Sequence, residues 1–532
     1  MSETILYNRV AGVEEGRGGM SETTNNRNGV KPLHMIIIDA WHPGLVEREL
    51  AAGKLPALAA LVKYGRLDMN CSSIFPTVTP ACLTSLATGV GPDRHGITGV
   101  LWYNRSADRY VHYWPYPQSL VWGTISHVIS DFFLRLNGEH LSTEIKTVFE
   151  LLEEADVPSA CINFPISRGP HRHAAEIPWF LRWLGKLPKN LHLPGPRSMR
   201  HGDMIRHGER RGRFFKKYGF NDRQSARYTA ELVQSPDRPA FMLTYLNEND
   251  LRSHHRGPWN NADSLHRVDA ELGVIMDAYG SWERAAKEAR WIITGDHSQS
   301  NTYPGRPGHA VNVFKAFPEY RICPLRTGGL ACKTYDFAVG PNDRMCYFYF
   351  GEGKEHVREE VIEKVVTWPS VDQVFWREGD TFYGYRRATG ERMSWTRGGG
   401  LVDPFGGRWE IEGSLGAVDG RLVGNRIQYG DYPNALARVT EALSVPGGGS
   451  LILTATLGYE FTSGFPMGKG NHGSLHVQDT HVPLLTCGIR QPLLNPRTTD
   501  IVPMILRELG VDLPDYLRPV TEPHPGIRQA GA

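Results

Sequence analysis

The apolar residues of this 532-residue chain fall into short continuous runs, several of which end in polar or acidic residues. Short apolar runs of this kind are typical of strands that are buried on both faces, as in a parallel sheet. We predict extended segments at residues 34–39, 67–74, 159–166, 240–246, 290–294, 450–456 and 482–486.

Between these runs, leucine and valine recur at roughly helical spacing. We predict helices at residues 43–64 (with an interruption near Gly53), 147–154, 264–279 and 500–509. Apolar strands that alternate with helices predict an α/β fold, in which a mostly parallel central sheet carries helices on both faces.

Residues 306–449 interrupt this alternation. They contain the apolar run M-C-Y-F-Y-F at 345–350, a charged helical stretch at 355–366, and segments rich in Gly, Trp and Arg. We predict an inserted small α/β lobe that caps the sheet's carboxyl edge, where such lobes shape substrate specificity. A purely structural insertion fits the same pattern. The main α/β domain then comprises residues 31–305 and 450–532.

The first 30 residues are rich in Gly, Asn and Arg, and are predicted to be disordered. The sequence Met-Ser-Glu-Thr occurs at residue 1 and again at Met20, so either methionine could be the start.

The composition narrows the function classes only slightly. A net charge of +2 offers no electrostatic argument for a nucleic-acid polymer or an anionic membrane, and the apolar runs are too short to span a bilayer. The seven cysteines are scattered, and the N-terminus lacks the long apolar run of a signal peptide. We therefore expect a cytoplasmic protein without a membrane partner, while the oligomeric state stays open.

The segment F-P-T-V-T-P-A-C-L-T-S-L-A-T-G, at residues 75–89, suggests a turn that leads into a helix. Proline is favoured at the first helical position, so Thr79 is predicted at the N-cap, before Pro80. A helix N-terminus attracts a phosphoryl group, and a hydroxyl placed there is a candidate nucleophile. An ordinary N-cap threonine is the alternative.

Four clusters of acids and histidines accompany the predicted strands. Asp39 ends the first strand, and Asp250 and His254 lie four residues apart beyond the strand at 240–246. The other members of the set are Asp296, His297 and His472. Carboxylates and imidazoles that converge on one sheet edge predict a transition-metal site, with zinc as the leading choice.

As an ordered set, these motifs resemble the alkaline phosphatase superfamily, and its nucleotide pyrophosphatase/type I phosphodiesterase branch most closely. The block I-I-I-D…F-P-T-V-T…T-G…P-D-R-H-G-I is similar to the strand and nucleophile region of that branch. N-D-L-R-S-H-H-R-G-P, G-D-H and N-H-G-S resemble its later metal motifs. The resemblance covers residues 33–100, 147–169, 240–297 and 450–511. It implies an alkaline-phosphatase-like α/β sandwich.

The resemblance also implies two divalent metal ions, zinc or alternatively manganese or iron. One ion would be held by Asp250, His254 and His472. The other would be held by Asp39, Thr79, Asp296 and His297. Thr79 would attack phosphorus and form a phosphothreonine that water then hydrolyses. Thr77 is a rival nucleophile, but it lies outside the predicted helix start.

The sequence departs from the pattern at Cys82. Many nucleotide-cleaving relatives carry there an asparagine that holds a phosphate oxygen, and a thiol is a much weaker donor. Cys82 is therefore a substrate-binding candidate that weakens the expectation of a nucleotide substrate. The absence of C-x-P-x-R around the nucleophile disfavours the sulfatase branch.

Three functions are compatible with these motifs. The first is a phosphodiesterase or pyrophosphatase acting on a small phosphoester. The second is a phosphomonoesterase or phosphomutase, for which Arg168 or Arg252 would have to neutralise the extra charge. The third is a non-catalytic, metal-stabilised binding protein, which the intact set of seven candidate ligands disfavours.

Overall fold

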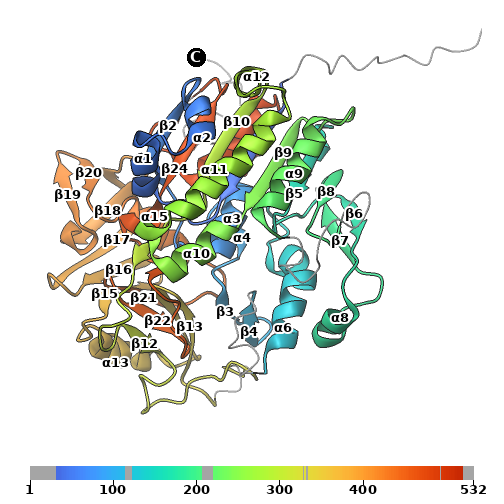
Figure 1. The fold of residues 1–532 in the computed structure, drawn as a ribbon. Coiled ribbons are helices and arrows are strands. Elements are labelled where there is room, and N and C mark those ends of the chain that lie inside the picture. The colour runs from blue at the N-terminus through green and yellow to red at the C-terminus, as the bar shows by residue number, and fades with distance from the viewer. Residues whose placement is uncertain are drawn as a thin grey trace, which may run out of the picture.

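A seven-stranded sheet forms the centre of the protein (Figure 1). The computed structural model describes residues 31–113, 123–205, 220–327, 329–330, 334–491 and 493–518, so the predicted N-terminal lead lies outside the described residues. The strand order is β2 (Gly65–Ser72), β24 (His481–Cys487), β10 (Arg290–Gly295), β1 (Leu33–Ile38), β9 (Phe241–Leu246), β5 (Ser159–Ile162) and β8 (Ser198–Arg200).

The sheet is parallel from β10 to β8, and β24 pairs antiparallel with both β10 and the edge strand β2. Residues of β1 alternate between two hydrophobic clusters: Met35 and Ile37 belong to one, Ile36 and Ile38 to the other. Apolar residues face both sides, so both faces must be covered. The predicted mostly parallel sheet is confirmed.

Helices cover both faces of the sheet, as predicted. Those that pack in the cluster with Ile36 are α1 (Pro43–Ala51), α2 (Pro56–Val62), α9 (Asp222–Val233), α11 (Ala262–Asp277) and α12 (Trp282–Glu288). Those that pack in the cluster with Met35 are α3 (Thr79–Thr88), α7 (Val148–Glu154) and α16 (Ile501–Glu508). The interruption predicted near Gly53 separates α1 from α2, and Gly53 itself takes a positive φ of 68°.

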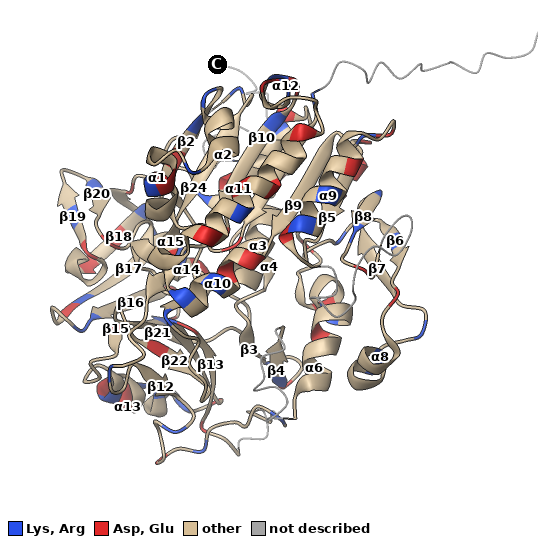
Figure 2. Cartoon of the chain, viewed as in Figure 1, with Lys and Arg blue, Asp and Glu red and all other residues tan. Residues whose placement is uncertain are grey.

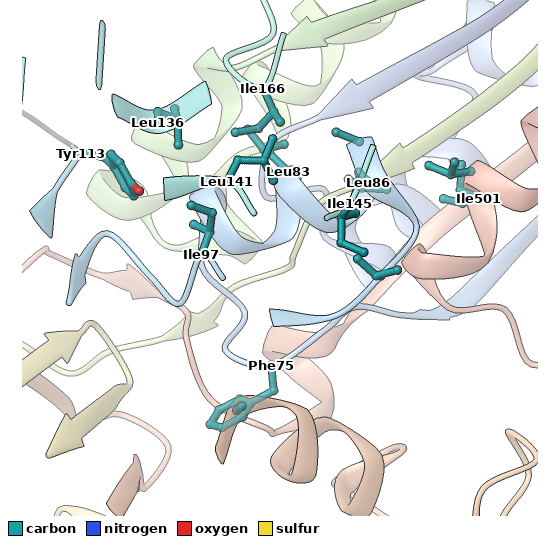
Figure 3. Packing of buried hydrophobic residues seen from close by; sticks show 14 of the residues in the cluster. Phe75, Leu83, Leu86, Ile97, Tyr113, Leu136, Leu141, Ile145, Ile166 and Ile501 are labelled. Atoms are coloured by element: carbon teal, nitrogen blue, oxygen red, sulfur yellow. The ribbon is translucent and has the colours of Figure 1, made fainter. Parts of the chain in front are cut away.

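Helix α3 is fixed in place by its apolar residues. Leu83 and Leu86 lie fully buried among Leu141, Ile145 and Ile166 (Figure 3). The helix begins at Thr79, with Val78 as the N-cap residue, so the prediction that Thr79 itself is the N-cap is wrong by one position. Pro80 occupies the first turn, where its missing N–H costs nothing.

A second, nine-stranded sheet lies beside the first (Figure 1). Its order is β13 (Phe337–Asn342), β14 (Met345–Phe350), β21 (Leu451–Ala455), β15 (Val371–Glu378), β16 (Thr381–Arg386), β17 (Glu391–Val402), β20 (Arg426–Tyr429) and β19 (Gly420–Val423), with β18 (Arg408–Gly413) paired to β17. Helix α13 (Glu355–Val365) packs on one face, and α14 (Ala435–Leu443) contributes to the cluster that continues into the central core.

Strand β21 corrects one expectation. Residues 450–456 do form a strand, but it pairs antiparallel with β14 and β15 in the second sheet, not with the central sheet. A fully buried apolar run has no polar face that would reveal its partner. The second sheet therefore extends beyond residue 449, the end predicted for the inserted lobe.

Shorter elements connect these layers. They include α4 (Pro92–His95), β3 (Leu101–Asn104), β4 (Arg109–His112), α6 (Ile125–Ser130), a π-helix (Asp131–His140), β6 (His171–Ala174), α8 (Trp179–Gly185), β7 (His192–Gly195), α10 (Glu248–Arg256), β11 (Ser300–Asn301), β12 (Ala310–Asn312), β22 (Glu460–Thr462), β23 (Gly470–Asn471) and α15 (Val477–Thr480). Lys and Arg are interspersed with Asp and Glu over most of the chain (Figure 2).

Candidate active site

Three neighbouring strands end level with one another at the carboxyl edge of the central sheet. Ile38 of β1 lies opposite Gly295 of β10 and Leu246 of β9. Asp39 and Asp296 directly follow two of these strands, and α10 follows the third. Open α/β sheets bind their ligands at this edge, because the carboxyl ends of parallel strands meet there.

The first group of site residues surrounds the hydroxyl of Thr79. The Oγ1 atom of Thr79 lies 3.0 Å from Nε2 of His297. The same Nε2 atom lies 3.5 Å from Oδ2 of Asp296 and 3.7 Å from Oδ1 of Asp39. Asp39, Asp296 and His297 are buried, whereas Thr79 is partly exposed at the start of α3. Thr79 is thus the least buried residue of this group.

The second group gathers around Asp250 of α10. Its Oδ1 atom lies 3.3 Å from Nε2 of His254 and 3.8 Å from Nε2 of His472. Residues four apart on a helix share a face, so Asp250 and His254 point the same way. His472 comes from the loop after β23, far along the chain. Only the folded structure brings these three side chains together.

The two groups adjoin each other. The rings of His297 and His472 are stacked, with centroids 3.7 Å apart. Ligand atoms of Asp250, His297 and His472 lie within 4.8 Å of one another, as do those of Asp39, Asp296 and His297. The structure therefore collects all seven predicted side chains in one cluster. Their individual roles as metal ligands remain predictions.

The carboxylates of this cluster fit a cation. Burial, and repulsion from Asp296 and Asp250, raise the pKa of Asp39 well above its usual range. Burial also raises the pKa of Asp296. The buried Oδ1 of Asp39 and Oδ2 of Asp296 have no hydrogen-bond partner within the described structure. Oxygens left without a donor, in a crowd of like charges, are suited to binding a divalent ion.

The three histidines are oriented as metal ligands usually are. Each points its Nδ1 atom at a backbone carbonyl: His254 at Gly470 (2.8 Å), His472 at Thr77 (2.7 Å) and His297 at Ser298 (3.1 Å). A carbonyl only accepts, so Nδ1 carries a proton and Nε2 is the ring nitrogen that faces the cluster.

Protons and metal ions compete for the second group. Burial lowers the pKa of His254, but Asp250 more than offsets this and the pKa rises to about 9. Burial and the neighbouring His297 hold the pKa of His472 well below its usual range. The protonated His254 balances the charge of Asp250, and a bound metal ion would take over that role by displacing the proton.

Three further residues hold the cluster and were missed by the sequence analysis. Tyr245 donates a hydrogen bond to Oδ2 of Asp39. Asn249 donates to the backbone oxygen of Asp39 at 2.9 Å, and Gln299 donates to Oδ1 of Asp250 at 2.6 Å. All three lie near predicted ligands in the sequence or at the same strand ends. Their sequence positions did not identify them, because a polar residue at such a position can bond to many different partners.

The second sheet reaches the cluster through the turn between β13 and β14. Asp343, at φ 60°, places Oδ2 4.0 Å from Nε2 of His472. Burial, with Glu460 and Asp250, raises the pKa of Asp343 to about 7. The next residue, Arg344, donates its backbone N–H to the oxygen of His472 (2.7 Å). The predicted lobe therefore supplies a carboxylate to this site, which no motif indicated.

The buried Arg344 also ties the second sheet to the loop that carries His472. Its guanidinium contacts Asp479 at 2.6 Å and the backbone oxygen of Ala455 at 2.9 Å. Asp479 in turn accepts a hydrogen bond from the Ser474 hydroxyl at 2.6 Å. A paired and hydrogen-bonded buried charge of this kind fixes the geometry of the groups around it.

Two other sequence candidates lie in buried surroundings. The Thr77 hydroxyl donates to the oxygen of Ser474 (2.9 Å) and accepts from the N–H of Gly473 (3.0 Å). Thr77 therefore holds the His472 loop, which agrees with ranking it below Thr79 as a nucleophile. The Cys82 thiol is fully buried, 3.4 Å from the Ser73 hydroxyl, and burial raises its pKa well above the usual range. In this buried position the thiol is not exposed, so the structure gives no support for the predicted contact between Cys82 and substrate.

Comparison with known proteins identifies the family of this fold and site. The sequence profile of the type I phosphodiesterase/nucleotide pyrophosphatase family matches residues 33–378. No curated protein matches the chain. Among solved structures, murine ectonucleotide pyrophosphatase/phosphodiesterase 5 is similar with a TM-score of 0.54 and 13% identity, over 91% of this chain and 96% of that one.

A second structure of the same murine protein, an inactive threonine-to-alanine variant in complex with AMP, matches with a TM-score of 0.54 and 12% identity over the same shares of both chains. At these identities the likeness concerns the fold, which is alkaline-phosphatase-like. The family profile covers well over half of the chain. The chain therefore belongs to the type I phosphodiesterase/nucleotide pyrophosphatase family and is a hydrolase of phosphoester bonds.

Proposed function

We propose that the protein hydrolyses the phosphodiester or pyrophosphate bond of a small nucleotide-type substrate, through a covalent phosphoryl intermediate on Thr79. The observation that carries this proposal is the position of the Thr79 hydroxyl, 3.0 Å from His297, at the start of α3 and beside both acid–histidine groups. The murine relative supports it, because its inactive form is a threonine-to-alanine variant that was crystallised with AMP.

The proposal includes two divalent metal ions, with zinc as the first choice and manganese or iron as alternatives. Asp250, His254 and His472 would hold one ion, and Asp39, Thr79, Asp296 and His297 would hold the other. Bound there, such ions would neutralise charge on the phosphoryl oxygens and lower the pKa of a hydroxyl or water. The unpartnered carboxylate oxygens and the inward-facing Nε2 atoms are the support for this set.

The chain's own residues would supply the nucleophile and its orientation. Oγ1 of Thr79 attacks phosphorus, the bond from phosphorus to the leaving oxygen breaks, and Thr79 carries the phosphoryl group. Water then attacks the same phosphorus and releases Thr79 with its proton restored. The positive end of the α3 dipole lies at Thr79, where it favours the anionic group throughout.

Two arginines were candidates for recognising a monoester dianion, and Arg168 is held by other partners. The Arg168 guanidinium contacts Glu150 at 3.1 Å and the backbone oxygen of Leu141 at 3.1 Å. Arg252 lies 3.9 Å from Glu248 on its own helix. A dianion needs more positive charge than a diester, so these positions favour a diester substrate over a monoester.

Paired turnover measurements test this preference. The zinc-loaded protein is assayed with bis-p-nitrophenyl phosphate and with p-nitrophenyl phosphate, each with and without chelator. We expect kcat/KM for the diester to exceed that for the monoester by at least about tenfold, the ratio that about 1.4 kcal/mol of transition-state binding produces. We expect chelation to abolish both activities. A monoester preference would overturn the diester assignment and favour a phosphomonoesterase or phosphomutase.

The cytoplasmic location expected from the sequence stays a proposal. The cysteines within the described residues are unpaired and buried: Cys71, Cys82, Cys161, Cys323, Cys346 and Cys487. Unpaired thiols are typical of a reducing compartment.

A further inference from the structure

Helix α8 carries two tryptophans that are unusually exposed. The side chains of Trp179 and Trp183 are 73% and 76% exposed, far more than the other aromatic residues of the described chain. The helix stands at the margin of the molecule, beyond β6 and β7 (Figure 1). Large aromatic side chains left in water in a group usually mark a binding surface.

The outward orientation of this pair is built into the helix. Residues four apart share a helix face, so Trp179 and Trp183 lie one above the other. Leu181 and Leu184, on the opposite face, pack against the main hydrophobic core. Gly185 lies so close to Ile129 that an added Cβ would come within 2.2 Å of it. The inner face is therefore tightly seated, and α8 cannot roll to bury its tryptophans without losing this packing.

Basic residues lie close to the two tryptophans in the sequence. Lys186, the C-cap residue of α8, and Lys189 follow Trp183 closely in the chain, and both are exposed. Residues 171–195 form β6, α8 and β7. This segment contains one acidic residue, Glu176, and four basic residues: Arg172, Arg182, Lys186 and Lys189. Its net charge of about +3 exceeds that of the whole chain, which is +2.

We propose that the outer face of α8 docks on an anionic lipid surface. Tryptophan prefers the boundary between headgroups and acyl chains, because its ring is apolar and its N–H is polar. Lysine and arginine beside it would contact lipid phosphates while their stems lie on apolar surface. No helix among the described residues is long and apolar enough to cross a bilayer. Docking of α8 would bring a phosphoester hydrolase to a surface rich in phosphoesters.

This arrangement distinguishes a lipid surface from a protein groove. Tryptophans that dock on another protein are usually enclosed by a pocket of that protein. The charges around such an interface complement those of the one partner. Here two exposed tryptophans and exposed basic residues occur together in one short helix and the segments beside it, the combination found in helices that lie in the plane of a membrane. A second copy of the chain, or another protein, is an outcome that the experiment can detect.

Vesicle binding of the full chain tests the proposal. The protein is sedimented with phosphatidylcholine vesicles that contain or lack phosphatidylserine, at low and at physiological salt. We expect binding to the anionic vesicles that weakens with salt and with loss of phosphatidylserine. The double variant Trp179→Ala/Trp183→Ala should bind at least about tenfold more weakly. Lys186→Glu/Lys189→Glu should also weaken binding, by removing attraction to the anionic headgroups.

Matched controls separate this face from the rest of the surface. Leu494→Ala removes another highly exposed apolar side chain (84%) and should leave binding unchanged. Lys54→Glu/Lys63→Glu makes the same change of charge at exposed positions elsewhere and should weaken binding much less. Diester turnover in solution should be unchanged in the tryptophan variant, which checks its fold and separates this proposal from the proposed catalysis.

Three results would overturn the proposal. The unaltered protein could fail to bind anionic vesicles, or the tryptophan and lysine variants could bind as well as it does. Alternatively, the unaltered protein could fail to bind vesicles and form a dimer by light scattering, while the tryptophan variant is a monomer. That last result would assign the face to a second copy of the chain.

Discussion

The Thr79→Ala variant is expected to lose essentially all diester turnover while it keeps its metal ions. The hydroxyl is the proposed nucleophile, and removal of a nucleophile from an enzyme of this kind costs about 10,000-fold or more in kcat. The buried acids and histidines that would hold the metal stay in place. Metal content per chain by elemental analysis, and kcat with bis-p-nitrophenyl phosphate, measure the two effects separately.

Thr84→Ala is the matched control for this variant. Thr84 lies on the same helix, and its hydroxyl donates to the backbone oxygen of Pro80 at 2.6 Å. Its loss should leave turnover within a few-fold of that of the unaltered protein. Full activity of Thr79→Ala would contradict the nucleophile assignment. Equal losses in both variants would attribute the effect to the helix instead of the hydroxyl.

The Asp296→Asn variant is expected to change stability in opposite directions with and without metal. Without metal, the substitution removes one of the repelling buried carboxylates, and the apo-protein should melt at a higher temperature than its unaltered counterpart. Oδ1 of the new amide can still accept from the N–H groups of Ala40 and His297, as Asp296 does at 3.2 and 2.9 Å.

With zinc present, the order should reverse. A ligand that binds only the folded state stabilises it by about 2.7 kcal/mol at a concentration 100 times its dissociation constant. Asp296→Asn should lose most of this gain at its site, along with activity, because a neutral amide is a poor ligand for a divalent cation. Thermal melts with zinc and with chelator measure both directions.

Asp269→Asn provides the comparison for this second prediction. Asp269 is another buried acid whose pKa is raised by burial, but it accepts hydrogen bonds from Ala57 and Leu58, at the start of α2. Its substitution should change stability equally with and without zinc. If Asp296→Asn responds to zinc as strongly as the unaltered protein does, Asp296 is not a metal ligand.

The candidate site could be predicted from the sequence where its residues belong to local patterns. Asp39 and Asp296 end apolar runs, and Asp250 and His254 show helical spacing. Strand ends and helix faces are local features, and parallel strands bring their ends together without further information. The same reasoning identified most elements of the central sheet.

The sequence did not predict the positions of side chains that are placed by packing between distant segments. Asp343 lies in a tight turn that local sequence can suggest, since Asn342 and Asp343 are turn residues between two apolar runs. Nothing local says that this turn ends beside His472. Packing between distant segments also determines which strands pair with β21 and why Cys82 is buried.

The central claim is a covalent phosphoryl group on Thr79, and trapping it is the most direct test. The zinc-loaded protein is quenched in acid during turnover of bis-p-nitrophenyl phosphate, digested, and analysed by fragmentation mass spectrometry. We predict a p-nitrophenyl-phosphoryl group on Thr79 that disappears once substrate is exhausted. An adduct on Thr77 or another residue, or an unmodified Thr79 throughout rapid turnover, would contradict the account.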